Sequence, residues 1–102
     1  MKKEKDYLKD IPEIYSQDGT GDDAIVFAHY KYNLSHWYIM EYNKQDSMYF
    51  GYACLNGWLD CAELGYISKS ELEMNGIKMD LDWNVKSLGE SKELLKKEIW
   101  QE

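Results

Sequence analysis

The chain has 102 residues and a formal charge of −7, and 44% of its residues are hydrophobic and 15% aromatic. This size and apolar content predict one domain over residues 1–102 with a single core, and the aromatic content excludes an intrinsically disordered chain. No apolar run approaches the roughly 18–20 residues that span a bilayer, and no apolar segment follows the basic N-terminus, so we expect a cytoplasmic protein.

The basic residues are all lysines, and their distribution leaves the middle of the chain acidic. Residues 10–90 contain fourteen Asp or Glu but five Lys, and the other lysines lie near the two ends. Arginine is the preferred residue for bidentate recognition of phosphates and bases. We therefore expect no direct binding of nucleic acid, and the acidic charge either attracts a basic partner or serves solubility.

The first half of the chain predicts strands joined by polar turns. Residues 1–10 are expected to form a short helix or a frayed arm, and a polar loop with two glycines follows at 16–23. Runs rich in β-branched and aromatic residues then predict strands. The expected strands are Ala24–Tyr32, Trp37–Tyr42 and Met48–Leu55, with turns at Asn33–Ser35 and Asn43–Asp46.

Asn56 and Gly57 form one of the strongest short hairpin signals, and they predict a two-residue turn into a fourth strand at Trp58–Tyr66. In that register Cys54 faces Leu59, and Cys61 is a diagonal neighbour roughly 7–8 Å away, beyond comfortable disulfide reach. We therefore expect two buried thiols. The hairpin would carry one apolar stripe, formed by Phe50, Tyr52, Cys54, Leu59 and Cys61.

The second half predicts a helix, a strand and a second helix. Ser68 and Glu71 have the spacing of a capping box for a short helix that Asn75–Gly76 would end. Alternating apolar residues over Ile77–Trp83 predict a half-buried strand, and an apolar stripe over 88–99 predicts the final helix. The expected fold is α+β, an antiparallel β-meander of four to five strands with two or three helices packed on one face.

No motif predicts a catalytic site. His29 and His36 bracket a turn, but nothing nearby pairs either with a nucleophile, so we expect a structural role for both. The cysteines and histidines lack the paired spacing of a zinc site. Asp18, Asp22 and Asp23 could hold Mg²⁺ or Ca²⁺, or could belong to a capped, solvated loop. We expect neither enzymatic activity nor a cofactor or resident metal.

Two further features bear on the surface. Asp80 and Asp82 share one face of the predicted strand, which we interpret as its solvated side. Trp37 and Tyr38 point to opposite faces of their strand, and Trp58 points away from the apolar stripe of its hairpin. Exposed aromatics near acids are typical of a binding surface, although a second layer or a dimer could also cover them.

Several segments occur together in an order known from one bacterial family. They are Ile11–Asp18, Gly21–Val26, Trp37–Tyr42, Phe50–Tyr52, Ala62–Leu72 and Ile77–Trp83. Over most of its length the chain thus resembles the domain-of-unknown-function family numbered twenty-nine fifty-eight. Members of that family often have a basic residue and a proline around the last strand, where this chain has Lys78 and no proline. The resemblance implies a small protein of plasmids, phages or conjugative elements, and it supplies no catalytic residues.

Some small acidic proteins of such elements block host defence nucleases, as anti-CRISPR and antirestriction proteins do, and this chain is similar to them in size and charge. We therefore predict an inhibitor that mimics the phosphate backbone and occupies the basic nucleic-acid-binding surface of an effector nuclease. The expected contacts are six carboxylates and one aromatic anchor, namely Asp18, Asp22, Asp23, Asp60, Asp80, Asp82 and Trp58.

Other functions stay open at this point. An accessory protein of plasmid replication or transfer could stack bases of single-stranded nucleic acid on its aromatics, or bind a replication protein. That role would be favoured if the lysines of the two ends met in space. A metal-dependent hydrolase on the acidic loop and an interaction module with another partner are further alternatives. We expect no membrane partner, and the sequence leaves a homo-oligomer open.

Overall fold

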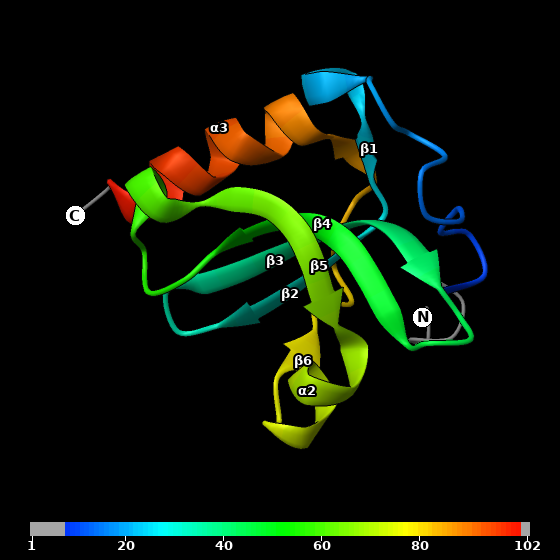
Figure 1. The fold of residues 1–102 in the computed structure, drawn as a ribbon. Coiled ribbons are helices and arrows are strands. Elements are labelled where there is room, and N and C mark those ends of the chain that lie inside the picture. Colours follow the sequence, from blue (N-terminus) through cyan, green and yellow to red (C-terminus); the bar gives the residue numbers. More distant parts are fainter. Residues whose placement is uncertain (1–7, 101–102) are drawn as a thin grey trace.

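The computed structural model describes residues 8–100, which form two antiparallel sheets and two α-helices (Figure 1). The larger sheet has the strand order β5-β4-β3-β2-β6, and the smaller pairs β1 with β7. The strands are β1 (Ile25–Val26), β2 (Ala28–Tyr32), β3 (Ser35–Asn43), β4 (Met48–Cys54), β5 (Glu63–Ser68), β6 (Lys78–Met79) and β7 (Lys86–Ser87). This architecture confirms the predicted α+β meander; most of the predicted arm at 1–10 lies outside the described residues.

The turn before β3 follows the predicted chemistry. Asn33 adopts a left-handed conformation with φ 54°, which lets Tyr32 pair directly with Ser35 across a two-residue turn. The strand predicted over Ala24–Tyr32 is divided in two, because β1 leaves the large sheet to pair with β7.

The predicted two-residue hairpin at Asn56–Gly57 is wrong, although the turn itself forms. Asn56 and Gly57 have φ 57° and 75°, and the Trp58 amide donates to the Leu55 carbonyl at 3.0 Å. The chain then enters a short 3-10 helix, η2 (Leu59–Cys61), and rejoins the sheet only at Glu63, which pairs with Ala53. Cys54 is accordingly buried whereas Cys61 is exposed, so the prediction of two buried thiols is also wrong.

Serine residues begin both helices, α2 (Lys69–Met74) and α3 (Leu88–Ile99). Ser68 accepts the Glu71 amide as predicted, and Gly76, at φ 71°, follows the end of α2. The complete capping box lies in α3, where Ser87 and Glu90 make both reciprocal bonds. The strand predicted over Ile77–Trp83 shortens to the two residues of β6.

Two apolar clusters flank the large sheet. One comprises Ile11, Ala28, Tyr30, Ile39, Tyr49, Ile67, Leu72 and Met79, and the other comprises Ala24, Val26, Tyr38, Met40, Cys54, Trp83, Leu88 and Leu95. Because α2 contributes to the first cluster and α3 to the second, the helices lie on opposite sides of the sheet (Figure 1). The prediction that the helices pack on one face is therefore wrong.

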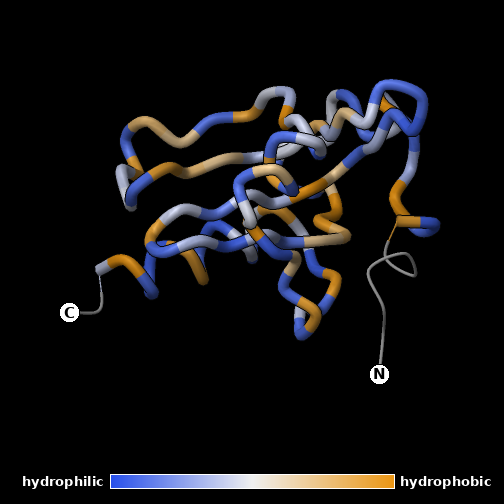
Figure 2. The backbone as a smooth tube through the Cα atoms, turned by 90° about the horizontal axis from the view of Figure 1, so that it is seen from below, coloured by the Kyte–Doolittle hydropathy of each residue, from blue (hydrophilic) through white to orange (hydrophobic). Residues whose placement is uncertain are grey.

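The described chain begins and ends on opposite sides of the molecule, as Figure 2 also shows from below. Of the lysines near the C-terminus, Lys92 pairs with Asp22 and Lys96 with Glu93. The two described ends form no joint basic patch, and Lys2, Lys3 and Lys5, on which the predicted patch also depends, lie outside the described residues. Within residues 8–100, neither helix is long and apolar enough to cross a membrane.

Candidate functional site

The seven predicted contact residues do not converge on one surface. Asp22 and Asp23 lie in the 3-10 helix η1 (Gly21–Asp23), beside the beginning of α3, where Asp22 pairs with Lys92 at 2.8 Å. Trp58 and Asp60 instead line a shallow depression with Trp100, which follows the C-terminal end of α3. Asp18 is exposed on the loop before η1. A continuous phosphate-like array of these carboxylates is therefore absent from the described surface.

The prediction that Asp80 lies on a solvated strand face is wrong. Its carboxylate is half-buried and lies 2.9 Å from His29, while its other oxygen accepts the Asp82 amide at 3.0 Å. Asp82 itself is exposed, as predicted. Among the described residues, no three His, Cys, Asp or Glu side chains are grouped closely enough to hold a metal ion.

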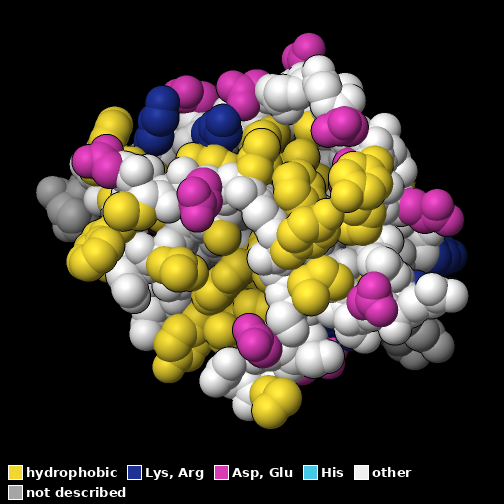
Figure 3. Space-filling model, viewed as in Figure 1, with side chains coloured by type: hydrophobic (Ala, Val, Ile, Leu, Met, Phe, Trp, Pro, Cys, Tyr) yellow, Lys and Arg dark blue, Asp and Glu magenta, His cyan; other side chains and the backbone are white. Residues whose placement is uncertain are grey.

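A concave surface lies where the loop at 14–21 crosses the outer half of the sheet. Its apolar lining comprises Ile14, Tyr15, Met40, Phe50, Leu64 and Tyr66, and we call it the Tyr15–Tyr66 groove. Figure 3 shows hydrophobic side chains gathered over β4 and β5, with carboxylates around them. The cavity measures about 130 Å³. Since small-molecule sites typically measure roughly 300–1,000 Å³, the groove suits a partner's side chains better than a cofactor.

Two polar side chains, one buried and one partly buried, hold the loop that forms one wall of the groove. The Glu41 carboxylate, 3% exposed, accepts the amides of Tyr15 and Gln17, each at 2.8 Å. The Gln17 side chain donates to the carbonyls of Ile25 and Met40, both at 3.0 Å, and accepts the Ile25 amide. Hydrogen bonds to a carboxylate are about twice as strong as neutral ones. The loop is thus fixed to β3 and β1 before any partner arrives.

This anchoring holds Tyr15 in a conformation that a bulky residue rarely adopts. Its φ is 76°, which costs on the order of 1–2 kcal/mol for a residue other than glycine. The ring is nevertheless 72% exposed and lies beside Tyr66, with 3.3 Å between the hydroxyls. Tyr66 in turn packs edge-on against Phe50 at 5.4 Å. Such strain concentrates at functional sites, where the surrounding structure imposes it.

The polar groups around the groove are mainly acidic. Asp18 is exposed and lines it directly, whereas Glu63, next to Leu64 on β5, points to the other face of the sheet. The Lys92 ammonium group lies 5.0 Å from the Tyr52 ring and is already paired with Asp22. The hydrogen bond with Tyr15 raises the pKa of Tyr66. The groove therefore combines exposed aromatic rings with the exposed carboxylate of Asp18.

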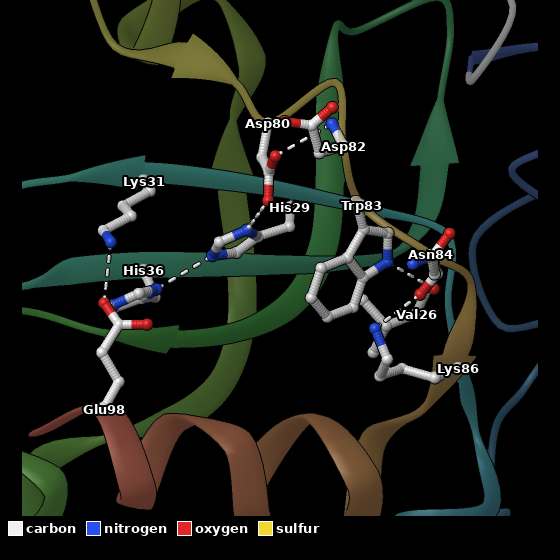
Figure 4. Close-up of polar contacts among 10 residues, drawn as sticks. All are labelled: Val26, His29, Lys31, His36, Asp80, Asp82, Trp83, Asn84, Lys86 and Glu98. Atoms are coloured by element: carbon white, nitrogen blue, oxygen red, sulfur yellow. Dashed lines mark hydrogen bonds and ion pairs between the residues drawn. The ribbon is translucent and has the colours of Figure 1, made fainter. Parts of the chain in front are cut away.

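A second cluster of polar residues lies beneath α3 (Figure 4). His29 Nδ1 lies 2.9 Å from Asp80, His29 Nε2 lies 2.9 Å from His36 Nδ1, and His36 Nε2 lies 3.2 Å from Glu98. Lys31 closes this chain at 2.8 Å from the same Glu98 oxygen. The sequence analysis did not predict this network. His29 and His36 flank a two-residue turn, and residues in such positions are diagonal neighbours on one face of the sheet.

The two rings of the histidine network are buried and packed against a neighbouring aromatic side chain. His29 and His36 are 6% and 1% exposed and stack on Tyr38, with centroid distances of 4.8 and 5.8 Å. Burial lowers the pKa of His29 against the opposing effect of Asp80, and burial lowers the pKa of His36 to about 4 despite Glu98. Both rings are therefore neutral at pH 7 and inaccessible to a substrate, in keeping with the structural role that the sequence predicts.

These pKa shifts predict that acid destabilises the fold. The histidine side chain gains a proton near pH 6.5 in the unfolded chain, whereas His36 gains it near pH 4 in the folded protein. The contribution of neutral His36 to the free energy of unfolding is therefore fully present above pH 6.5 and declines as the pH falls below that value. The loss from His36 amounts to about 3 kcal/mol by pH 4. Urea titrations between pH 7.5 and 5 would measure the slope, and His36→Gln should flatten it. An equal slope in both proteins would contradict this assignment.

Comparison with known proteins identifies no relative: no family model, curated protein or solved structure matches the chain. The resemblance to the family numbered twenty-nine fifty-eight therefore stays a prediction, and the function is argued from the site.

Proposed function

We propose that the protein is a non-catalytic binding module whose Tyr15–Tyr66 groove receives an apolar segment of a basic partner protein. The observation that carries the proposal is Tyr15 itself, a bulky exposed ring held at φ 76° by a loop that a buried carboxylate anchors. Strain and a buried charge both oppose folding, and neither is needed to build the core. Their presence beside exposed aromatics supports selection for binding.

The composition of the groove supports recognition of protein rather than nucleic acid. Tyrosine is enriched at the centres of protein interfaces because it supplies large, rigid contact area with a polar tip. Bases could stack on the same rings, but Asp18 beside them would repel the phosphates that connect those bases. A partner with basic side chains around an apolar segment meets both features of the site.

Inhibition of a host defence nuclease is the specific role that we propose. The effectors of such systems hold nucleic acid in positively charged channels, and a chain with a charge of −7 would be attracted to them in the cytoplasm. Since the carboxylates are dispersed, we propose that the groove supplies most of the contact and that charge mainly steers association. An accessory role in plasmid replication is a weaker alternative, because the described ends do not meet.

Substitution of the groove aromatics tests this proposal. Tagged protein would capture partners from a bacterial lysate that contains CRISPR and restriction systems, and the recovered partner would then be titrated by surface plasmon resonance. Tyr66→Ala is expected to weaken binding about ten- to a hundredfold, as for a typical interface hot spot. Tyr15→Gly should also weaken binding while relieving the backbone strain, so a loss of affinity without a loss of stability separates contact from folding.

Tyr32→Ala is the matched control, because Tyr32 is 55% exposed at the end of β2 and outside the groove. Its affinity should equal that of the wild type. Capture of a partner whose affinity is unchanged by Tyr66→Ala, or capture of nucleic acid alone, would contradict the proposal.

A further inference from the structure

Strand β5 forms an open edge of the large sheet. It pairs with β4 on one side over six residues, and no described strand lies along its other side (Figure 1). Folded proteins usually block such edges with lysine, proline, a bulge or a covering segment, or they keep the edge strand short. The opposite edge follows this rule, since β6 has two residues. The sequence of β5, Glu63–Ser68, contains neither lysine nor proline.

Gly65 in the middle of β5 has no role within the described chain. Its φ is not in the left-handed region, and a Cβ added there would meet nothing within 4 Å. Its cross-strand neighbour differs, because a Cβ on Gly51 would overlap backbone atoms of β3. A glycine weakens a strand interior, and where no internal contact requires it, it often marks a place where another backbone approaches closely.

The two faces of β5 set the chemistry of an approaching strand. Leu64 and Tyr66 point toward the Tyr15–Tyr66 groove and are 46% and 58% exposed. Glu63 and Gly65 alternate with them and point to the other face. The side chains of an added strand would also alternate between the two faces. Those on one face would contact Leu64 and Tyr66, and those on the other would contact Glu63 and the open space at Gly65.

The charge of the protein favours a foreign strand over a second copy. Each copy carries a formal charge of −7, and Glu63 is the only charged side chain on β5, so antiparallel pairing of two copies brings acidic surfaces together without a compensating cation. A segment in which lysine or arginine alternates with apolar residues complements both faces. We infer that the partner contributes such an extended segment, which adds to the outer edge of β5 as a sixth strand of the sheet. This inference rests on the proposed function and specifies its binding mode.

A synthetic ten-residue peptide that alternates lysine with leucine or phenylalanine, capped at both ends, serves as the probe. Two further versions carry N-methyl groups on three alternate residues, one version on the odd and the other on the even positions. In an added strand, alternate backbone amides face β5 and solvent. One methylation pattern should therefore lower affinity at least about tenfold, and the other should change it less than about twofold. Calorimetry measures the affinities.

Protein variants complete the design. Glu63→Lys should weaken the peptide about tenfold through the reversed charge, whereas Glu93→Lys on exposed α3 should not. Equal effects of the two methylation patterns, with binding still dependent on Tyr66, would overturn strand addition and leave the groove as a binding site. If peptide affinity is unchanged by Tyr66→Ala, by Glu63→Lys and by both methylation patterns, the groove proposal is overturned as well. A stable dimer that the peptide cannot dissociate would assign the edge to self-association and overturn the inference.

Discussion

Replacing Gly51 with alanine is expected to destabilise the protein by more than about 4 kcal/mol, which is an exceptionally large loss for a single substitution. An added Cβ would overlap the Tyr38 carbonyl oxygen and would lie 3.0 Å from the Tyr38 carbonyl carbon and 3.2 Å from Ile39 Cα. All three are backbone atoms of β3, so no side-chain rotation relieves the clash. The strand must shift beside an existing irregularity between Ile39 and Glu41.

Gly65→Ala is the matched control, because Gly65 lies directly opposite Gly51 and has open space around its Cα. Its substitution should change stability by no more than about 0.5–1 kcal/mol, and it can stabilise by restricting the unfolded chain. Soluble yield, far-ultraviolet circular dichroism and urea denaturation would compare the two variants. Equal stability of Gly51→Ala and Gly65→Ala would show that β3 yields at this point, against the expectation.

Local sequence signals predicted the meander well, and long-range pairing accounts for what they missed. The turn at Asn56–Gly57 forms with the predicted left-handed residues, because turn conformation depends on those residues alone. The register beyond it depends on what each following side chain packs against. Leu59 packs partly against the second apolar cluster from η2, and the Asn56 amide is held by Ser35. These tertiary contacts replace the continuous hairpin.

The histidine network illustrates a second limit of sequence analysis. The spacing of His29 and His36 around a short turn could have indicated that their side chains meet on one face of the sheet. Their other partners are Asp80, which directly follows β6, and Glu98 of α3, both more than fifty residues away along the chain. Asp80 was predicted to face solvent because alternation places it there, yet β6 ends at Met79 and Asp80 donates its amide to the His29 carbonyl at 2.7 Å.

The groove was predictable only in composition. Exposed aromatics near acids indicated a binding surface, but the anchor that the sequence favoured, Trp58, lies elsewhere, although it is indeed exposed. Tyr15 and Glu41 carried no signal on their own, because neither the left-handed backbone of one nor the burial of the other is encoded in a short motif. Both follow from the way the loop at 14–21 crosses β3.

Glu41→Ala is expected to cost about 4 kcal/mol, because two charge-assisted hydrogen bonds worth about 1.5–3 kcal/mol each are lost together. The amides of Tyr15 and Gln17 then lose the acceptor that Glu41 provides, so the loop should detach from β3. Glu41→Gln keeps the shape and one acceptor oxygen, and it should lose about half as much. Urea denaturation at pH 7 would measure both variants against Glu13→Ala, which removes an exposed carboxylate from the same loop.

Amide hydrogen exchange separates this local effect from a general loss of stability. If Glu41 fixes the loop, exchange of the Tyr15 and Gln17 amides should accelerate in Glu41→Gln far more than exchange in β3 and β4. The same variant should bind the partner less tightly even where it is fully folded, because Tyr15 no longer holds its strained position beside Tyr66. Unchanged protection of the two amides would instead mean that Gln17, through Ile25 and Met40, is sufficient to position the loop.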